Sequence, residues 1–194
     1  MEINKFLRKV STYHTMKNID NIKISKAIPD DAEGIQILTA ESSKGMYALC
    51  GWSPEEISNH FPIEKIKEGA ERLRKLIPTF TEDDIMFVAK DEENKIIGCC
   101  LAEKQKNINK IEAVYISPEF QGFGLGKKLY DTAYGLLNHN NHTFLDVFSL
   151  NSKAINFYKK LGFLETGKKT FDKRFKDSKG NILEISEMML VGQK

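Results

Sequence analysis

The residues whose types and spacing best suit chemistry lie in a glycine-rich turn, residues 121–127 (QGFGLGK). Glycines at alternate positions let the backbone approach a ligand closely, because they carry no side chain. The helix that we expect over 124–137 would offer free N–H groups and its positive dipole end to an anion. Lys127 and Lys128 fall in its first turn, where the dipole disfavours cations unless a negative ligand is bound. The turn therefore predicts an anion site, with a simple loop carrying solvated lysines as the alternative.

Two common phosphate-binding motifs do not fit this turn. A P-loop places Ser or Thr after its Gly-Lys pair, where this chain has Lys128. A dinucleotide fingerprint, G-x-G-x-x-G, needs its third glycine one residue later than Gly126. We therefore expect neither a magnesium-dependent P-loop enzyme nor a dinucleotide oxidoreductase.

A second motif follows about thirty residues later and changes the interpretation. It reads N-x-x-A-x-x-x-Y-x-x-x-G-F from Asn151 to Phe163, and the turn itself reads Q-x-x-G-x-G. In this order and at this separation, the two motifs resemble the acyl-CoA-binding blocks of the GNAT family of N-acetyltransferases. The resemblance covers roughly residues 22–190 and accounts poorly for 42–84. It implies acetyl-CoA as the cofactor and acetyl transfer to an amine as the reaction.

The resemblance also assigns cofactor contacts to positions in this chain. Backbone groups of the preceding strand would bind the pantetheine arm, and the turn would hold the pyrophosphate, mainly through N–H groups. Asn151 would hydrogen-bond the arm, with capping of the following helix as its alternative role. The cofactor-binding residues expected in this way are Val114, Ile116, Gln121, Gly122, Phe123, Gly124, Leu125, Gly126, Lys127 and Asn151.

Acetyl transfer needs a proton donor for the departing thiolate and a proton acceptor for the amine, because an alkylammonium has a pKa of about 10.4. Tyr158 matches the family tyrosine that acts as donor, although its place in an apolar helical stripe also suits a core role. Glu112 and Asp146 are the candidate acceptors, acting directly or through water. Strand alternation predicts that Glu112 shares a face with Val114 and Ile116. Each carboxylate could instead be a solvated strand residue.

The pattern along the chain predicts an N-terminal extension, residues 1–20, and one N-acetyltransferase domain, residues 21–194. A strand over 22–27 precedes a helix over 32–40, and residues 42–52 break the pattern. Ser53 and Pro54 then open a helical region to about residue 76, interrupted near Pro62. Further strands are expected at 85–89, 96–102, 108–116, 144–148, 163–175 and 182–190, and helices at 124–137 and 152–161. This order favours a mixed α/β fold with antiparallel hairpins at one side. The resemblance implies an α/β, GNAT-like fold with a mixed, mainly antiparallel sheet flanked by helices on both faces.

Composition narrows the class of protein. The 194 residues include 25 Lys and 4 Arg and carry a net charge of +2, without the basic excess typical of nucleic-acid binders. There is no apolar run long enough to span a membrane and no signal-peptide core near the N-terminus. The three cysteines and four histidines lack metal-ligand spacing. We therefore expect free thiols, no metal site, no nucleic-acid or membrane partner, and a cytoplasmic location.

The sequence leaves the acceptor open. The resemblance places acceptor choice in residues 41–80 and 167–180, and residues 54–84 carry eight acidic against five basic residues. An acidic face attracts a polyamine, and the chain is similar to spermidine/spermine acetyltransferases of the bacterial PaiA type, although a solvated helix explains the same charges. The alternatives are a protein α-amine, as for the ribosomal-protein alanine acetyltransferases, and a non-catalytic acyl-CoA sensor. The oligomeric state is also open, with a homodimer among the options.

Overall fold

The computed structural model describes residue 19 and residues 21–191. The expected extension, residues 1–20, therefore lies almost entirely outside the described residues, and the expectation of one domain over 21–194 stays a prediction. Within the described part, no helix combines the length and the apolar composition that crossing a bilayer requires.

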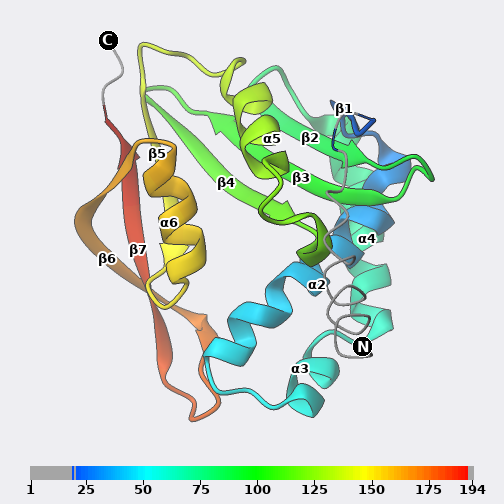
Figure 1. Ribbon diagram of the computed structural model, residues 1–194, viewed down its shortest axis with the longest axis vertical. Coiled ribbons are helices and arrows are strands. Elements are labelled where there is room, and N and C mark those ends of the chain that lie inside the picture. Colours follow the sequence, from blue (N-terminus) through cyan, green and yellow to red (C-terminus); the bar gives the residue numbers. More distant parts are fainter. Residues whose placement is uncertain (1–18, 20, 192–194) are drawn as a thin grey trace, which may run out of the picture.

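The described residues form one sheet in the order β1-β2-β3-β4-β5-β7-β6 (Figure 1). All neighbouring strands pair antiparallel except β4 and β5, which run parallel. The predicted mixed and mainly antiparallel sheet is therefore confirmed. The strands are β1 (Lys23–Lys26), β2 (Asp84–Lys90), β3 (Ile96–Lys104), β4 (Ile108–Ile116), β5 (His142–Phe148), β6 (Phe163–Lys176) and β7 (Ile182–Leu190).

Helices cover both faces of the sheet, as predicted (Figure 1). On one face, Leu129 of α5 and Tyr158 of α6 join a core cluster with Leu145 of β5. On the other face, Ile35 of α2 packs with Val88 of β2. The helices are α2 (Ala32–Leu49), α3 (Pro54–His60), α4 (Ile63–Leu76), α5 (Leu125–Tyr134) and α6 (Ser152–Lys160), with short 3₁₀ turns η1 (Pro29–Asp31), η2 (Ile77–Thr79) and η3 (Pro118–Phe120).

Helix α2 is longer than its sequence predicts. We expected it to end near residue 40, because the serines and glycine of the following segment are poor helix formers. The helix instead continues to Leu49. The hydroxyl of Ser42 donates to the carbonyl of Ile116 at the end of β4, 3.3 Å away. This tertiary contact and packing against α4 support the extra turns, so α2 reaches past the end of the central strands.

Helix α3 begins and ends where local signals predict. The hydroxyl of Ser53 accepts the N–H of Glu56, and the Glu56 carboxylate accepts the N–H of Ser53 in return. This reciprocal cap and Pro54 at the first position define the start. The helix stops before Phe61 and Pro62, so the predicted interruption is confirmed. The chain then turns into α4, and the α3 end stays beside the end of α2.

Two glycines of α2 provide a matched test of how closely this helix approaches the sheet. A Cβ at Gly34 would lie 2.5 Å from Cγ1 of Ile96, whereas a Cβ at Gly45 would meet no atom within 4 Å. Alanine gains about 1 kcal/mol over glycine from helix propensity, but overpacking costs about 1–3 kcal/mol. We expect Gly45→Ala to raise the free energy of unfolding by about 1 kcal/mol and Gly34→Ala to lower it by about 1 kcal/mol in urea denaturation. Equal gains from both variants would contradict the close approach.

Candidate active site

The site is built on an opening between β4 and β5. These strands pair only where residues 108–111 face residues 142–145, although β4 continues to Ile116 and β5 to Phe148. On its other side, β4 pairs with β3 through Ala113 and then Ile111, so Glu112 is skipped as a bulge. A bulge bends its strand and increases its twist. Beyond Glu112 the two parallel strands therefore run apart, and the edge of β4 is open toward β5.

The open edge of β4 presents backbone polar groups. The N–H of Ser117 donates to the carbonyl of Ile97, so the odd-numbered residues of this strand end bond to β3. The N–H and C=O groups of the residues between them, Val114 and Ile116, consequently point away from β3 and toward the opening. Backbone groups of this kind need a partner when they are buried. The edge can therefore hydrogen-bond an extended ligand.

In the segment where β4 and β5 still pair, a buried asparagine holds the two strands together. The side-chain amide of Asn109 donates to the carbonyl of Asn138, 2.8 Å away, and to the hydroxyl of Thr143 on β5, 3.2 Å away. Its oxygen accepts the N–H of Asn138 at 3.3 Å. Asn109 and Thr143 are both fully buried. This network fixes β4, β5 and the loop before β5 at the base of the opening.

The glycine turn lies between η3 and α5, at the end of β4. Gly122 and Gly124 have φ values of 89° and 87°, in the left-handed region that favours glycine. A Cβ at Gly122 would meet no atom within 4 Å, so the turn is open on that side. Gly124 is the N-cap of α5 and provides no side-chain cap. The first N–H groups of α5 are therefore available to an anion, together with the positive end of the helix dipole.

Side chains of the turn divide between anchoring and surface positions. Leu125 is fully buried in the core and fixes the turn there, whereas Phe123 is half-buried. Gly126 allows α5 to pass close to the ring of Phe157 on α6. The ammonium of Lys127 is exposed and pairs with Asp131 one turn later, 2.5 Å away. Lys127 thus has a carboxylate partner within α5, and its expected cofactor contact stays a prediction.

Two predicted cofactor contacts already have partners within the protein. The side chain of Gln121 donates to the carbonyl of Ile116 at 2.9 Å and accepts from Lys153 of α6 at 2.5 Å. Gln121 therefore ties the turn to β4 and α6. The side-chain oxygen of Asn151 accepts the N–H of Ala154 at 3.1 Å and caps α6. The capping role left open for Asn151 is present, and its amide nitrogen still has donors for another partner.

Tyr158 lies on α6 in the core on the face that α5 also covers. It is 8% exposed, and its ring contacts those of Phe157 and Phe163. Burial raises the pKa of the Tyr158 phenol well above its ordinary value, with smaller contributions from Cys100 and Tyr115. The phenol is therefore protonated at neutral pH. It can donate a proton only to a group that becomes strongly basic beside it.

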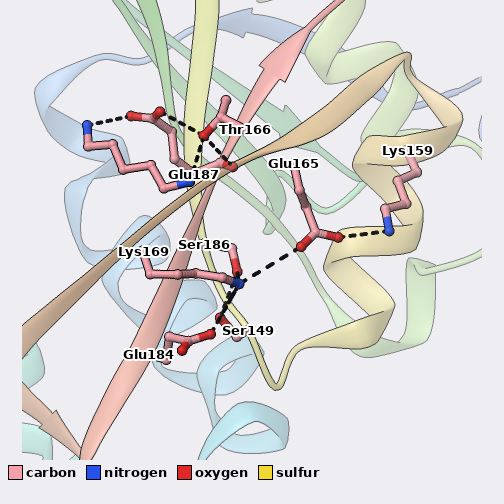
Figure 2. A network of polar contacts seen from close by, with 9 residues as sticks. Ser149, Lys159, Glu165, Thr166, Lys169, Glu184, Ser186 and Glu187 are labelled. Carbon is pink, nitrogen blue, oxygen red and sulfur yellow. Dashed lines mark hydrogen bonds and ion pairs between the residues drawn. The ribbon is translucent and has the colours of Figure 1, made fainter.

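A polar network fastens α6 and the end of β5 to the last two strands (Figure 2). The hydroxyls of Ser149 and Ser186 lie 2.7 Å apart, and Lys169 of β6 donates to Ser186 at 2.5 Å. Lys159 of α6 pairs with Glu165 of β6, 2.9 Å away. Helix α6 is thus held to β6 as well as to the core. The network keeps the candidate proton donor in place beside the opening.

The two candidate proton acceptors share one lysine. Lys110 lies 3.4 Å from a carboxylate oxygen of Glu112 and 3.2 Å from one of Asp146. Burial lowers the pKa of Lys110, but the hydrogen bond to Asp146 and the charge of Glu112 outweigh it, so the net pKa is raised. Lys110 is therefore cationic at neutral pH. It holds both carboxylates on the sheet face opposite to Tyr158.

The predicted orientation of Glu112 is wrong. We expected Glu112 to share a face with Val114 and Ile116, but its carboxylate pairs with Lys110. Val114 and Ile116 pack in the α5 and α6 core together with Ile111. The bulge at Glu112 adds one residue to β4 and so reverses the alternation beyond it. Both carboxylates are partly exposed on their own face.

Sequence reasoning missed Lys110 and Asn109. Lys110 stands two residues before Glu112, and this spacing predicts one strand face. Asn109 is a polar residue in an otherwise apolar strand, which is a signal for a buried polar network. The cysteines of the described residues are free, as expected, and burial raises the pKa of Cys99 and Cys100 to about 12. Within residues 19 and 21–191, no three His, Cys, Asp or Glu side chains are placed to share a metal ion.

Comparison with known proteins identifies the family to which this chain belongs. The acetyltransferase (GNAT) family matches residues 46–163, which is more than half of the chain. The chain belongs to the GNAT family. Among curated relatives, the peptidyl-lysine N-acetyltransferase YjaB of Escherichia coli K12 is 30% identical over 100 residues. That match covers 52% of this chain and 63% of YjaB, which is less than two thirds of its length.

Solved structures of other GNAT proteins have the same fold. The PaiA N-acetyltransferase of Thermoplasma acidophilum, in complex with coenzyme A, matches with a TM-score of 0.62 and 26% identity. The match covers 86% of this chain and 97% of PaiA. The solution structure of apo-form YjaB from Escherichia coli matches with a TM-score of 0.57 and 22% identity, over 88% of this chain and 98% of YjaB. The expected GNAT-like fold class is confirmed.

The ion pairs of Lys110 yield a stability prediction. Lys110→Met keeps most of the apolar stem but leaves Glu112 and Asp146 without their shared cation. Partly exposed pairs contribute about 0.5–1 kcal/mol and are screened by salt. We expect the variant to lose about 1 kcal/mol of unfolding free energy in urea at low salt, and much less in 1 M NaCl. Lys106→Met, which changes an exposed lysine in the turn between β3 and β4, is the control. A loss that does not depend on salt would mean that packing, not charge, is what Lys110 provides.

Proposed function

We propose that this protein transfers an acetyl group from acetyl-CoA to a primary alkylamine by direct attack, with a polyamine as the acceptor. The observation that carries the proposal is the opening between β4 and β5, with the uncapped start of α5 at its end and Tyr158 beside it. Family membership supports the reaction class. The PaiA relative, solved with coenzyme A and 26% identical, supports the cofactor.

The residues at the opening fit such a cofactor. Backbone groups of Val114 and the N–H of Ile116 would bind the pantetheine arm, since the Ile116 carbonyl already accepts from Gln121 and Ser42. N–H groups of the turn, residues 122–127, would bind the pyrophosphate at the positive end of α5. The side-chain NH₂ of Asn151 would contact the arm. When bound, acetyl-CoA supplies the acetyl group as a reactive thioester.

Tyr158 would act as the general acid. Its raised pKa keeps a proton on the phenolic oxygen across the neutral range, so that the proton is available when a thiolate departs. Glu112 or Asp146 would accept the proton that the ammonium of the acceptor must lose. Donor and acceptor groups lie on opposite faces of the sheet. Proton release and proton delivery are thus separated by the opening, where the acetyl group would pass.

The acceptor is inferred from charge and from relatives. Residues 54–84 carry eight acidic against five basic residues, and α3 within this stretch lies at the end of α2. A polyamine and a lysine side chain both offer a primary ammonium on an alkyl chain. The relative YjaB is a peptidyl-lysine N-acetyltransferase, so a lysine side chain of a peptide is the second candidate. An acyl-CoA sensor and a protein α-amine acceptor are outcomes that the test below separates.

The first test measures release of coenzyme A thiol from acetyl-CoA with spermidine, with a lysine-containing peptide, and with a peptide whose only amine is its N-terminus. We expect saturable release with spermidine and a loss of about 10²-fold or more in Tyr158→Phe, because a general acid contributes about 10²–10⁴-fold. Tyr130→Phe is the matched control, since the hydroxyl of this buried tyrosine has no hydrogen-bond partner among the described residues. Release with a peptide but not with spermidine would mean that the acceptor is a peptide amine and not a polyamine. No release with any amine, but a thermal shift with coenzyme A, would indicate a sensor.

The second test assigns the proton acceptor. We expect Glu112→Gln to lower kcat with spermidine by about 10²-fold or more, because a general base contributes on this scale, and Asp146→Asn to lower it by less than tenfold. The pH profile of kcat should lose its acidic limb in the variant that removes the base. The opposite ranking would assign the role to Asp146. Unchanged profiles in both variants would contradict a carboxylate base.

A further inference from the structure

Four partly exposed rings form a cluster at the end of α2, which we call the aromatic cluster: Tyr47, Trp52, His60 and Phe61. The ring centroid of Tyr47 lies 5.2 Å from that of Trp52, 4.7 Å from His60 and 5.4 Å from Phe61. The rings come from the last turn of α2, the following loop and the end of α3. None of them belongs to the two buried cores of the sheet. Partly exposed rings gathered outside the cores in this way form a candidate binding surface.

The turn between β6 and β7 holds this cluster in place. The indole N–H of Trp52 donates to the carbonyl of Lys176 at 3.2 Å, and the N–H of Ser178 donates to the carbonyl of Cys50 at 3.1 Å. Gly51 has a φ of 82°, and a Cβ there would lie 2.7 Å from the Ser178 hydroxyl. The single hydrogen-bond donor of the indole is thereby used. Trp52 can recognise a ligand only through its ring face.

The cluster is uncharged at neutral pH. Burial raises the pKa of Tyr47, with a smaller contribution from Cys50, so its phenol stays protonated. Burial, with a smaller effect of Lys65, lowers the pKa of His60, so its imidazole stays neutral. No lysine or arginine within the described residues stacks on these rings. Neutral aromatic faces attract cations through the negative potential of the ring.

A negatively charged side chain lies near the aromatic cluster. Asp177 in the β6–β7 turn acts electrostatically on Cys50, next to Tyr47. Hydrogen bonds from Asn181 and Lys179 lower the pKa of Asp177, so this carboxylate is ionised at neutral pH. Lys179 in the same turn and Lys65 beside His60 bring positive charge to the region as well. Asp177 is therefore the group that supplies negative charge to a cationic ligand at the cluster.

The cluster lies beyond the reacting end of the site. Ser42 touches the end of β4, and Tyr47 follows five residues later, about 7.5 Å further along the helix. Tyr115 of β4 is within electrostatic range of both regions, since, besides burial, Tyr47 raises its pKa and Tyr115 in turn raises that of Tyr158. An amine that reacts at the opening must be neutral. A group bound by the cluster is therefore a second part of the same acceptor.

We propose that the aromatic cluster binds the distal ammonium of a di- or polyamine acceptor while the other end of the acceptor reacts at the opening. The inference rests on the proposed acetyl transfer and adds the residues that would select a second positive charge. Trp52 and Tyr47 supply the ring faces, and the β6–β7 turn orients the indole. A monoamine would lack this contact and bind more weakly.

The chain offers a direct readout, because Trp52 is its only tryptophan. Titration with spermidine should change the tryptophan fluorescence saturably, whereas n-butylamine at equal ionic strength should not. In Tyr47→Leu, which keeps the reporter, we expect Kd for spermidine to rise about 2–30-fold, the equivalent of about 0.5–2 kcal/mol for a cation–π contact. Phe171→Leu, an exposed ring on the edge strand β6, is the matched control and should leave Kd unchanged. Absence of a spermidine-specific change would overturn the proposal.

Turnover separates this proposal from the proposed function. With spermidine as acceptor, Trp52→Leu should lower kcat/KM about 2–30-fold and Trp52→Phe should retain most of it, whereas kcat/KM for n-butylamine should stay unchanged in both. Equal losses with both amines would overturn the cluster as a specificity element while acetyl transfer stands. Saturable fluorescence changes without any thiol release would uphold the cluster and refute acetyl transfer to polyamines. A protein that neither releases thiol nor responds in fluorescence refutes both.

Discussion

The structure depends on an incomplete pairing of two parallel strands. Backbone N–H and C=O groups in a sheet interior normally find partners in the adjacent strand. Here β4 and β5 pair over four residues and then separate, after Glu112 is skipped by β3. The buried side chain of Asn109 closes the base of the pair. The two strands therefore begin to separate at a fixed point. Beyond it, β4 has an unpaired edge in the middle of the sheet, and this edge can bind an extended ligand.

The two sides of this opening have different electrostatic character. On the α5 and α6 side, burial keeps the Tyr158 phenol protonated. On the other side, Lys110 holds Glu112 and Asp146 at partly exposed positions. The sheet lies between the buried phenol and the partly exposed carboxylates, so each group keeps its own environment. The same bulge that opens the strands also turns Glu112 away from the core.

The acceptor end is assembled from segments that are distant in sequence. The β6–β7 turn is joined to the end of α2 and the following loop by hydrogen bonds from Trp52 to the carbonyl of Lys176 and from Ser178 to the carbonyl of Cys50. The polar network around Lys169 fixes the same two strands to α6 (Figure 2). One hairpin thus contacts both the helix of the candidate acid and the aromatic cluster. This arrangement couples the position of Trp52 to the frame that holds Tyr158.

The sequence by itself determined the features that local chemistry controls: the glycine turn, the Ser53 cap, the strand pattern and the position of Tyr158 on a helix. Each depends on residues within one or two turns of each other. Only the tertiary structure decided the length of α2, the direction of Glu112 and the meeting of Trp52 with the β6–β7 turn. The first needs the Ser42 contact to β4, and the second is a register shift between two strands. The third joins residues more than a hundred positions apart, and no local periodicity encodes such a contact.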